Sequence, residues 1–256
     1  MKLICPVCKA QLAKYEKEAV CANGHHYDYA KSGYLNLLRK QSRSHGDDAG
    51  MVKARTNFLA SGAYGFLREA LCDITKKYNP SVLADLGCGE GYYTSLLKAE
   101  EKYGFDMSKD ALKHAAKNDH STQYAVASIF ALPLRDACCE MVLTCFAPFA
   151  GDEISRILKD GGKFVFVTPG KRHLFELKEL LYETPYENRI TDLDTSLKLI
   201  DTQVIQNTFH ASNEALMDLF MMTPYAYRTA EAGKEKLRRT ESLDVTAEFI
   251  IRIYEK

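Results

Sequence analysis

Along most of the chain, short apolar runs alternate with stretches whose apolar residues recur at the spacing of helical turns. Runs of the first kind predict buried strands, and stretches of the second kind predict helices. Strands are expected over 81–86, 102–106, 123–127, 140–145 and 163–168. Helices are expected over 51–60, 64–78, 92–97, 109–117, 152–159 and 172–182. Strands that alternate with helices require right-handed crossovers, so this part of the chain predicts a mainly parallel sheet.

Two longer extended segments, 197–206 and 243–254, follow the alternating part and predict a terminal antiparallel pair. The 256 residues are enough for one α/β core and a small accessory module. No run approaches the ~20 apolar residues that span a bilayer, and the first residues have no signal-like apolar region. We therefore expect a cytoplasmic protein with no membrane partner.

A glycine-rich loop follows the first predicted strand, with the sequence Asp85-Leu-Gly87-Cys-Gly89-Glu-Gly91. Glycine lets the backbone turn sharply and lets a ligand approach it closely. The helix expected after the loop would offer free N–H groups at its amino terminus to an anionic group. In a dinucleotide-binding loop the third glycine comes one residue later, so the spacing argues against a pyrophosphate ligand.

A second acid, Asp106, ends the next predicted strand and is suited to bind ribose hydroxyls. The glycine loop and this acid together resemble the S-adenosylmethionine site of class I methyltransferases. In that family the residues after the third strand hold the adenine, which assigns this role to Ser128. The alternative interpretation of the loop is a glycine turn without a ligand.

The first 26 residues hold two corners that are typical of zinc sites. Cys5-Pro-Val-Cys8 is the first, and Cys21-Ala-Asn-Gly-His25-His26 is the second. Each corner presents two ligands from one tight turn, as a tetrahedral zinc ion requires. Either histidine could be the fourth ligand, and His25 gives the tighter corner. With four ligands no coordination position stays open, so a structural ion is expected.

Charge is balanced over the whole chain, with 34 basic and 34 acidic residues, but not over its first part. Residues 1–60 contain ten basic and five acidic residues, an excess of five. Distributed lysines and arginines bind phosphates, and interleaved tyrosines offer surfaces for base stacking. This predicts an RNA-binding surface that includes Lys9, Arg39 and Lys40; the alternative is an ordinary solvated surface.

The loop after the fourth predicted strand has the sequence Phe146-Ala-Pro148-Phe149. Two phenylalanines around a proline could sandwich a planar base, because stacking requires only a π face. Aromatic side chains are equally common in cores, so core packing is the competing interpretation of both residues.

Motifs along nearly the full length resemble the bacterial 23S rRNA (guanine-N1)-methyltransferase family. Besides the zinc corners and the glycine loop through Tyr93 and Thr94, the matching blocks are Tyr27-Asp-x-Ala-Lys31, Thr168-Pro-Gly-x-Arg-His173 and Met222-Thr-Pro-Tyr-Ala-Tyr-Arg228. The resemblance implies an α/β class I methyltransferase, Rossmann-like, with a mainly parallel seven-stranded sheet and a small N-terminal zinc-binding module. The implied division is a zinc-binding RNA-recognition module at 1–38, a linker at 39–50 and a methyltransferase domain at 51–256.

The resemblance also implies the cofactors, the substrate and the site residues. The cofactors are S-adenosylmethionine and a structural Zn²⁺, and the substrate is a guanine in a hairpin loop of 23S rRNA. The implied zinc ligands are Cys5, Cys8, Cys21 and His25. The cofactor-binding residues expected from the motifs and the resemblance are Tyr64, Asp85, Gly87, Gly89, Gly91, Tyr93, Thr94, Asp106, Ser128 and His173. The oligomeric state stays open, with a homodimer as one arrangement.

Two other functions are compatible with these motifs. One is a class I methyltransferase that acts on a small molecule, and the other is a catalytically inactive zinc-ribbon protein that binds RNA. Removal of the guanine N1 proton requires a base, and the sequence identifies none. Asp152, Glu153 and Glu176 lie near the candidate loops but are expected to be solvated or helix-terminal acids.

Overall fold

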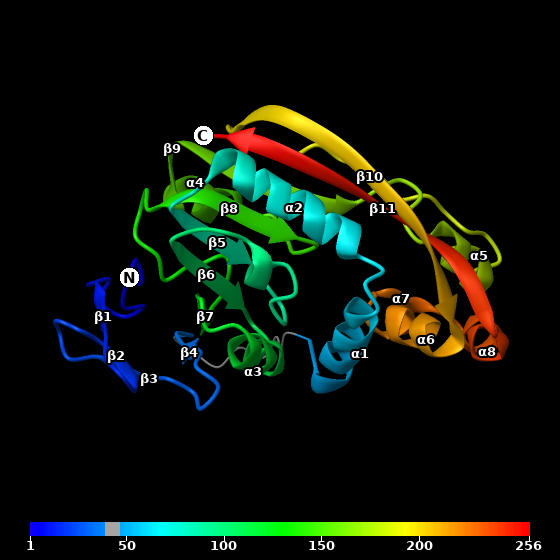
Figure 1. Cartoon of the computed structure of the whole chain (residues 1–256), viewed down its shortest axis with the longest axis horizontal. Coiled ribbons are helices and arrows are strands. Elements are labelled where there is room, and N and C mark those ends of the chain that lie inside the picture. The colour runs from blue at the N-terminus through cyan, green and yellow to red at the C-terminus, as the bar shows by residue number, and fades with distance from the viewer. Residues whose placement is uncertain (39–46) are drawn as a thin grey trace.

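The computed structural model describes residues 1–38 and 47–256, and its centre is an eight-stranded sheet (Figure 1). The strand order is β10-β11-β9-β8-β5-β6-β7-β4. These strands are β4 (Leu35–Asn36), β5 (Val82–Leu86), β6 (Glu101–Asp106), β7 (Thr122–Val126), β8 (Cys139–Cys145), β9 (Leu158–Pro169), β10 (Lys198–Ser212) and β11 (Ser242–Glu255). Strands β4 to β9 pair in parallel, and β11 joins β9 and β10 in antiparallel fashion.

The parallel strands and the terminal antiparallel pair confirm the prediction from the sequence. The eighth strand, β4, was not predicted. It consists of only two residues, and its partner β7 is remote in sequence, so its hydrophobic pattern gives no signal. The sheet therefore has one strand more than the seven expected.

Helices cover both faces of the sheet and its far end. They are α1 (Ala49–Ala60), α2 (Gly65–Tyr78), α3 (Lys109–Asn118), α4 (Gly151–Ile157), α5 (Phe175–Leu181), α6 (Asn213–Met221), α7 (Tyr225–Arg228) and α8 (Glu231–Arg239). The last three lie between β10 and β11 in the chain and form a cap at one end of the molecule (Figure 1). No helix in the two described ranges is both long and apolar enough to cross a membrane.

The helix expected over 92–97 is not formed, and this expectation is wrong. The segment contains a single 3₁₀ turn, Thr94–Leu96, and Leu97 is already extended. Six residues are fewer than two helical turns, so few hydrogen bonds would repay the cost of nucleation. The loop therefore has no helix dipole behind it.

The amino-terminal module is a small three-stranded sheet of β1 (Leu12–Lys14), β2 (Glu18–Cys21) and β3 (His26–Asp28). It is attached to the large sheet through β4 and through the Ile4 amide, which donates to the Pro133 carbonyl at 2.9 Å. Buried apolar residues of the module belong to the same cluster as those of β5 to β9; they include Leu3, Leu12 and Leu35. The module and the large sheet share one core.

Candidate cofactor and zinc sites

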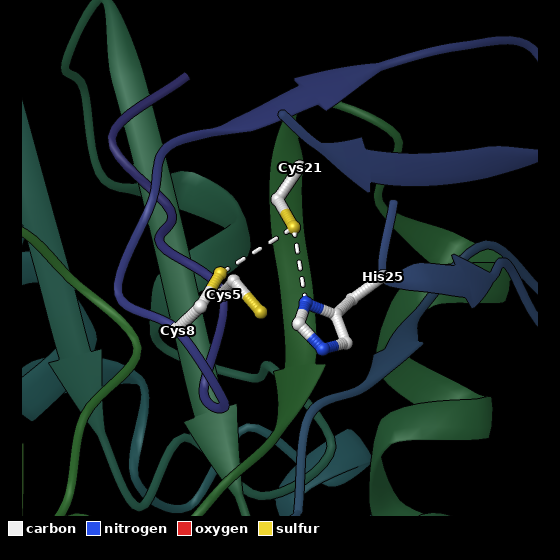
Figure 2. Close-up of side chains that lie close together, drawn as sticks. All are labelled: Cys5, Cys8, Cys21 and His25. Atoms are coloured by element: carbon white, nitrogen blue, oxygen red, sulfur yellow. Dashed lines mark hydrogen bonds between the residues drawn. The ribbon is translucent and has the colours of Figure 1, made fainter. Parts of the chain in front are cut away.

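Four metal-type ligands come together in the amino-terminal module, from two turns of the chain (Figure 2). Cys5 and Cys8 lie before β1, Cys21 ends β2, and His25 lies just before β3. Their donor atoms all lie within 4.8 Å of one another. Sγ of Cys21 lies 3.6 Å from Sγ of Cys8 and 3.3 Å from Nδ1 of His25.

This donor set fits a tetrahedral zinc ion. With Zn–S bonds of about 2.3 Å, two ligands of a tetrahedron lie about 3.8 Å apart, which is close to the separations in the cluster. Nδ1 of His26, the other histidine considered, lies 2.7 Å from the Glu18 carboxylate instead, so His25 completes the set. Three thiolates and one imidazole leave no open position, so the ion is structural.

The surroundings of Cys5 favour the thiolate that a metal requires. Burial raises the pKa of this thiol, but hydrogen bonds from the Tyr27 hydroxyl and from backbone amides outweigh burial and lower the pKa to about 6. The Tyr27 Oη lies 3.1 Å from Sγ of Cys5. A thiol that ionises easily binds zinc with a smaller cost of deprotonation.

The glycine loop lies at the carboxyl end of β5, between the ends of β6 and β8, where ligands of open α/β sheets bind. Gly87 has φ +80°, and a Cβ there would lie 2.5 Å from Cβ of Ala147 in the loop after β8. Gly91 has φ +79°, and its Cβ would lie 2.7 Å from the Tyr124 hydroxyl. Both positions therefore require glycine, because the conformation and the available space exclude a side chain.

The two acids predicted from the sequence lie on either side of this loop. Asp85 is buried, and one of its oxygens accepts a hydrogen bond from the Thr94 hydroxyl. The Asp106 carboxylate accepts from the amides of Gly89 at 2.9 Å and Ser108 at 2.7 Å. The backbone after β7 joins the same edge through the Ala127 amide, which donates to the Asp106 carbonyl at 3.2 Å. Ser128 thus follows directly beside Asp106.

An aromatic cluster forms the other half of the site. Phe249 of β11 is at its centre, with ring centroids 4.9 Å from Tyr64, 4.8 Å from His173 and 5.2 Å from Phe146. Phe146 in turn lies 6.5 Å from Tyr93, which follows the glycine loop. Residues from segments far apart in the sequence therefore meet around one strand, and most of them belong to the predicted set.

Several polar side-chain atoms are buried and have no hydrogen-bond partner within the described residues. Those of the loop and the residues around it are Tyr64 Oη, Tyr92 Oη, Tyr93 Oη, Asp85 Oδ1 and Arg55 Nη2. The others are Thr144 Oγ1, on β8, and Thr56 Oγ1, which belongs to the lining of the groove between α1 and α3. A buried unsatisfied polar group costs about 1–3 kcal/mol, so such a concentration calls for a polar ligand. The amino-acid tail, sulfonium and ribose of S-adenosylmethionine offer suitable partners, and the residues present fit this cofactor.

Two domain families match the sequence. The family described as RlmA, N-terminal, matches residues 3–44, and the family described as Methyltransferase domain matches residues 84–166. A 23S rRNA (guanine(748)-N(1))-methyltransferase of Streptomyces fradiae is 34% identical over 239 residues, which cover 88% of this chain and 85% of that protein. The chain belongs to the 23S rRNA (guanine-N1)-methyltransferase family. A Micromonospora griseorubida protein with the family's name is 32% identical over 98% of this chain and 95% of its own length.

Solved structures agree with the fold of this methyltransferase. A chain in the complex between the Haloferax volcanii Trm112 methyltransferase activator and a methyltransferase has a TM-score of 0.51 at 19% identity, and the match covers 83% of this chain and 99% of that one. A structure described as a type II methyltransferase of Anaeromyxobacter dehalogenans has a TM-score of 0.50 at 19% identity, over 68% and 89% of the two chains. The two domain families, the relatives and the cysteine–histidine cluster give S-adenosylmethionine and a structural zinc ion as the cofactors of the methyltransferase.

The two phenylalanines after β8 do not form a pair in the methyltransferase. Phe149 packs into the core, with its ring 5.8 Å from Phe164 and 6.3 Å from Phe166. Phe146 has φ +60° and stays 44% exposed beside the aromatic cluster. The base sandwich expected from the sequence is therefore not present in this arrangement, because the two rings belong to different clusters.

The basic residues expected to bind RNA are only partly described. Lys9 is exposed in the turn between Cys8 and β1, with φ +62°. Arg39 and Lys40 lie outside the described residues, as does most of the expected linker. Glu153 lies in the first turn of α4, as expected for a helix-terminal acid, and its carboxylate accepts from the Leu132 amide and pairs with Arg156.

His173 is held in its neutral form. Burial and, to a smaller extent, the charge of Lys178 lower the pKa of the imidazole to about 3. Its Nδ1 accepts a hydrogen bond from the Glu248 amide at 3.3 Å. The Nε2 nitrogen then carries the proton and can donate to an acceptor in the site. The neutral imidazole of His173 can therefore act as a hydrogen-bond donor.

Sequence analysis missed two residues of this site, Arg55 and Phe249. Arg55 lies on α1, some thirty residues before the glycine loop, and only the tertiary fold brings it to Glu90 at 2.5 Å. Phe249 was part of a predicted strand, but nothing in an extended apolar run marks the residue that will lie at the centre of an aromatic cluster. Of the Arg55–Glu90 pair, only Glu90 lies in a motif that the sequence reveals, the glycine loop.

Proposed function

We propose that this chain transfers the methyl group of S-adenosylmethionine to N1 of a guanine in a hairpin loop of 23S rRNA. The observation that carries the proposal is the cluster of unsatisfied buried polar atoms around the Asp85 loop. It lies in a chain that belongs to the family of this activity. A catalytically inactive RNA-binding protein would have no use for so many buried polar atoms without partners.

The reaction forms an N1–CH₃ bond, breaks the S–CH₃ bond and releases the N1 proton. The cofactor supplies the methyl group on a positively charged sulfur. The chain contributes mainly position, because in-line approach of the acceptor accounts for most of the rate. We assign the cofactor contacts to Tyr64, Asp85, Gly87, Gly89, Gly91, Tyr93, Thr94, Asp106, Ser128 and His173.

We assign the stacking contact with the target guanine to Phe146. Its ring is 44% exposed at the end of β8 and lies next to Tyr93, beside the cofactor loop. A strand end with an exposed aromatic ring gives an extruded base a surface to stack on. Bases in a hairpin loop are the least costly to extrude, which favours a loop over a duplex. The catalytic base stays unassigned.

The RNA backbone fits the groove between α1 and α3 better than the larger groove beside the zinc module. The α1–α3 groove has a volume of about 340 Å³, and its lining includes Lys53, Lys113, Lys117, His114 and Asp110. Within the described residues none of the three lysines forms an ion pair with a carboxylate. Unpaired lysines in a groove next to the cofactor site are suited to phosphates.

The larger groove, of about 930 Å³, lies at the amino ends of β6 and β7, on the edge opposite the cofactor loop. Its lining charges balance. The acids are Glu16, Asp28, Glu100, Glu101 and Asp119, and the cations are Lys14, Lys17, Lys31, Lys102 and the amino group of Met1. A balanced groove does not attract a polyanion. We propose that the zinc module, residues 1–38, contacts the hairpin through its outer turn at Lys9.

Primer extension on 23S rRNA tests the proposed function. Methylation of guanine N1 blocks Watson–Crick pairing, so reverse transcriptase stops one nucleotide before the modified base. Ribosomal RNA from cells with the gene should show one stop in a hairpin loop, and RNA from deletion cells should not. Identical stop patterns in the two samples would contradict the proposal and favour a small-molecule substrate.

A further inference from the structure

Arg55, on α1, lies against the cofactor loop and is fixed there by two ion pairs. Its Nε donates to the Glu90 carboxylate at 2.5 Å, and its Nη1 pairs with Asp47. The Arg55 side chain is 20% exposed and that of Glu90 is 6% exposed. Because the guanidinium is planar, two fixed nitrogens also determine the position of the third.

The third nitrogen, Nη2, lies beside Gly89 of the loop. It is buried and has no hydrogen-bond partner within the described residues. A Cβ on Gly89 would lie 3.1 Å from it, so Nη2 lies directly over the backbone that the cofactor approaches. A buried donor without an acceptor is costly, and a guanidinium has five N–H groups to satisfy. The Nη2 protons are left for a ligand.

The acids around the loop indicate which part of S-adenosylmethionine Nη2 binds. The Asp106 carboxylate already accepts the Gly89 amide and is the acid assigned to the ribose hydroxyls. The only anionic group of S-adenosylmethionine is the carboxylate of its amino-acid tail. Asp85 is buried and Asp106 partly buried at this site, so a carboxylate needs a cation beside it to bind here.

We propose that Nη2 of Arg55 binds the carboxylate of the amino-acid tail of S-adenosylmethionine, and that Asp47 and Glu90 hold the guanidinium in position for it. This inference rests on the proposed function, because it adds a residue to the same cofactor site. It also gives α1 a role, because this helix supplies the cation that the loop lacks.

The alternative is that Arg55 only ties α1 to the loop, and two ligands separate the two roles. S-Adenosylhomocysteine has the amino-acid tail, whereas 5′-methylthioadenosine keeps the adenosine and the sulfur but lacks the tail. By calorimetry, Arg55→Gln should lower the affinity for S-adenosylhomocysteine about 10- to 100-fold, as expected for a hydrogen bond between charged groups. The affinity for 5′-methylthioadenosine should change less than about threefold. Arg55→Lys, which keeps the charge, should retain an intermediate affinity for S-adenosylhomocysteine.

Arg156→Gln is the matched control, since Arg156 is also partly buried and held by the acids Asp136 and Glu153, away from the cofactor loop. It should leave the affinities for both ligands unchanged. Equal losses of both ligands in Arg55→Gln, or no loss of S-adenosylhomocysteine, would overturn the inference. Failure of the unmodified protein to bind S-adenosylhomocysteine would instead contradict the proposed function, so the two failures are distinguishable.

Discussion

Asp85 has its carboxyl group in the interior of the protein, where ionisation costs free energy. Burial and, to a smaller extent, the nearby Asp106 raise the pKa of Asp85 to about 7, although the hydrogen bond from Thr94 lowers it. A raised native pKa means that the folded protein keeps this proton to a higher pH than the unfolded chain does. Stability therefore falls as pH rises from about 4 to about 7, and the contribution stays unfavourable above that range. A cationic cofactor would favour the ionised form.

Asp85→Asn should therefore stabilise the protein without ligand while it weakens cofactor binding. We expect the midpoint of thermal unfolding to rise by about 2–4 °C at pH 8, equivalent to about 1 kcal/mol, and by less at pH 5. Scanning calorimetry at the two pH values measures the difference, with the exposed Asp160→Asn as the control. A shift of the same size at both pH values would show that titration of Asp85 is not its cause.

At the scale of elements, the zinc module packs against one edge of the large sheet. Leu35 and Asn36 pair with Ala125 and Val126 of β7, and Leu12 is buried in the core of the sheet. The module has little apolar material of its own, so the metal supplies much of its folding energy. We propose that residues 51–256 form a domain that keeps its fold without the metal.

Cys21→Ser should remove the zinc and unfold residues 1–38, because a hydroxyl is a poor zinc ligand. We expect metal analysis to find no zinc, and limited proteolysis to cut within the module. Binding of S-adenosylhomocysteine should stay within about threefold of its original affinity. Cys72→Ser, at a cysteine outside the cluster, is the control and should retain zinc. Retention of zinc by Cys21→Ser would rule out the ligand set.

The elements that the sequence predicted well are those with a local signal. Each central strand is a buried apolar run, and each predicted zinc ligand belongs to a short motif. What the sequence did not predict depends on partners that are remote in the chain. Strand β4 forms by pairing with β7, which lies far from it in the sequence. Helices α6 to α8 pack over the end of the long β10–β11 pair. Arg55 and Phe249 entered the site in the same way, through tertiary contacts.

For the whole molecule, the distribution of charge matters more than the net charge of zero. The cofactor edge has an α1–α3 groove with three lysines that make no ion pair among the described residues, whereas the lining charges of the opposite groove balance. Helix α1 lies next to both α3 and α6. It forms one wall of the α1–α3 groove and also carries Arg55. A bound RNA strand and the cofactor would thus contact one element from two sides.

Replacement of Lys53, Lys113 and Lys117 by glutamine should weaken binding to a 23S rRNA hairpin and flatten its salt dependence. Each lost phosphate contact reduces the magnitude of the slope of log affinity against log salt by about 0.7–0.9, so the triple variant should lose about 2–3. Affinities at several salt concentrations give the slope. The control replaces Lys76, Lys77 and Lys98, which lie outside the groove, by glutamine. It has the same change in charge and should keep the slope of the unmodified protein. Equal slopes for the two triple variants would show that the RNA does not bind in the α1–α3 groove.

Methyl transfer to purified RNA is the most direct test of the central claim. The full chain, loaded with zinc, is incubated with S-adenosylmethionine that carries a labelled methyl group and with 23S rRNA that lacks the modification. The RNA is then digested to nucleosides. We predict that the label is recovered as N1-methylguanosine, at one residue per RNA, and that Gly89→Val abolishes it, because a branched side chain would occupy the space over the loop next to Arg55. Label in any other nucleoside, or no label in the RNA, would contradict the account.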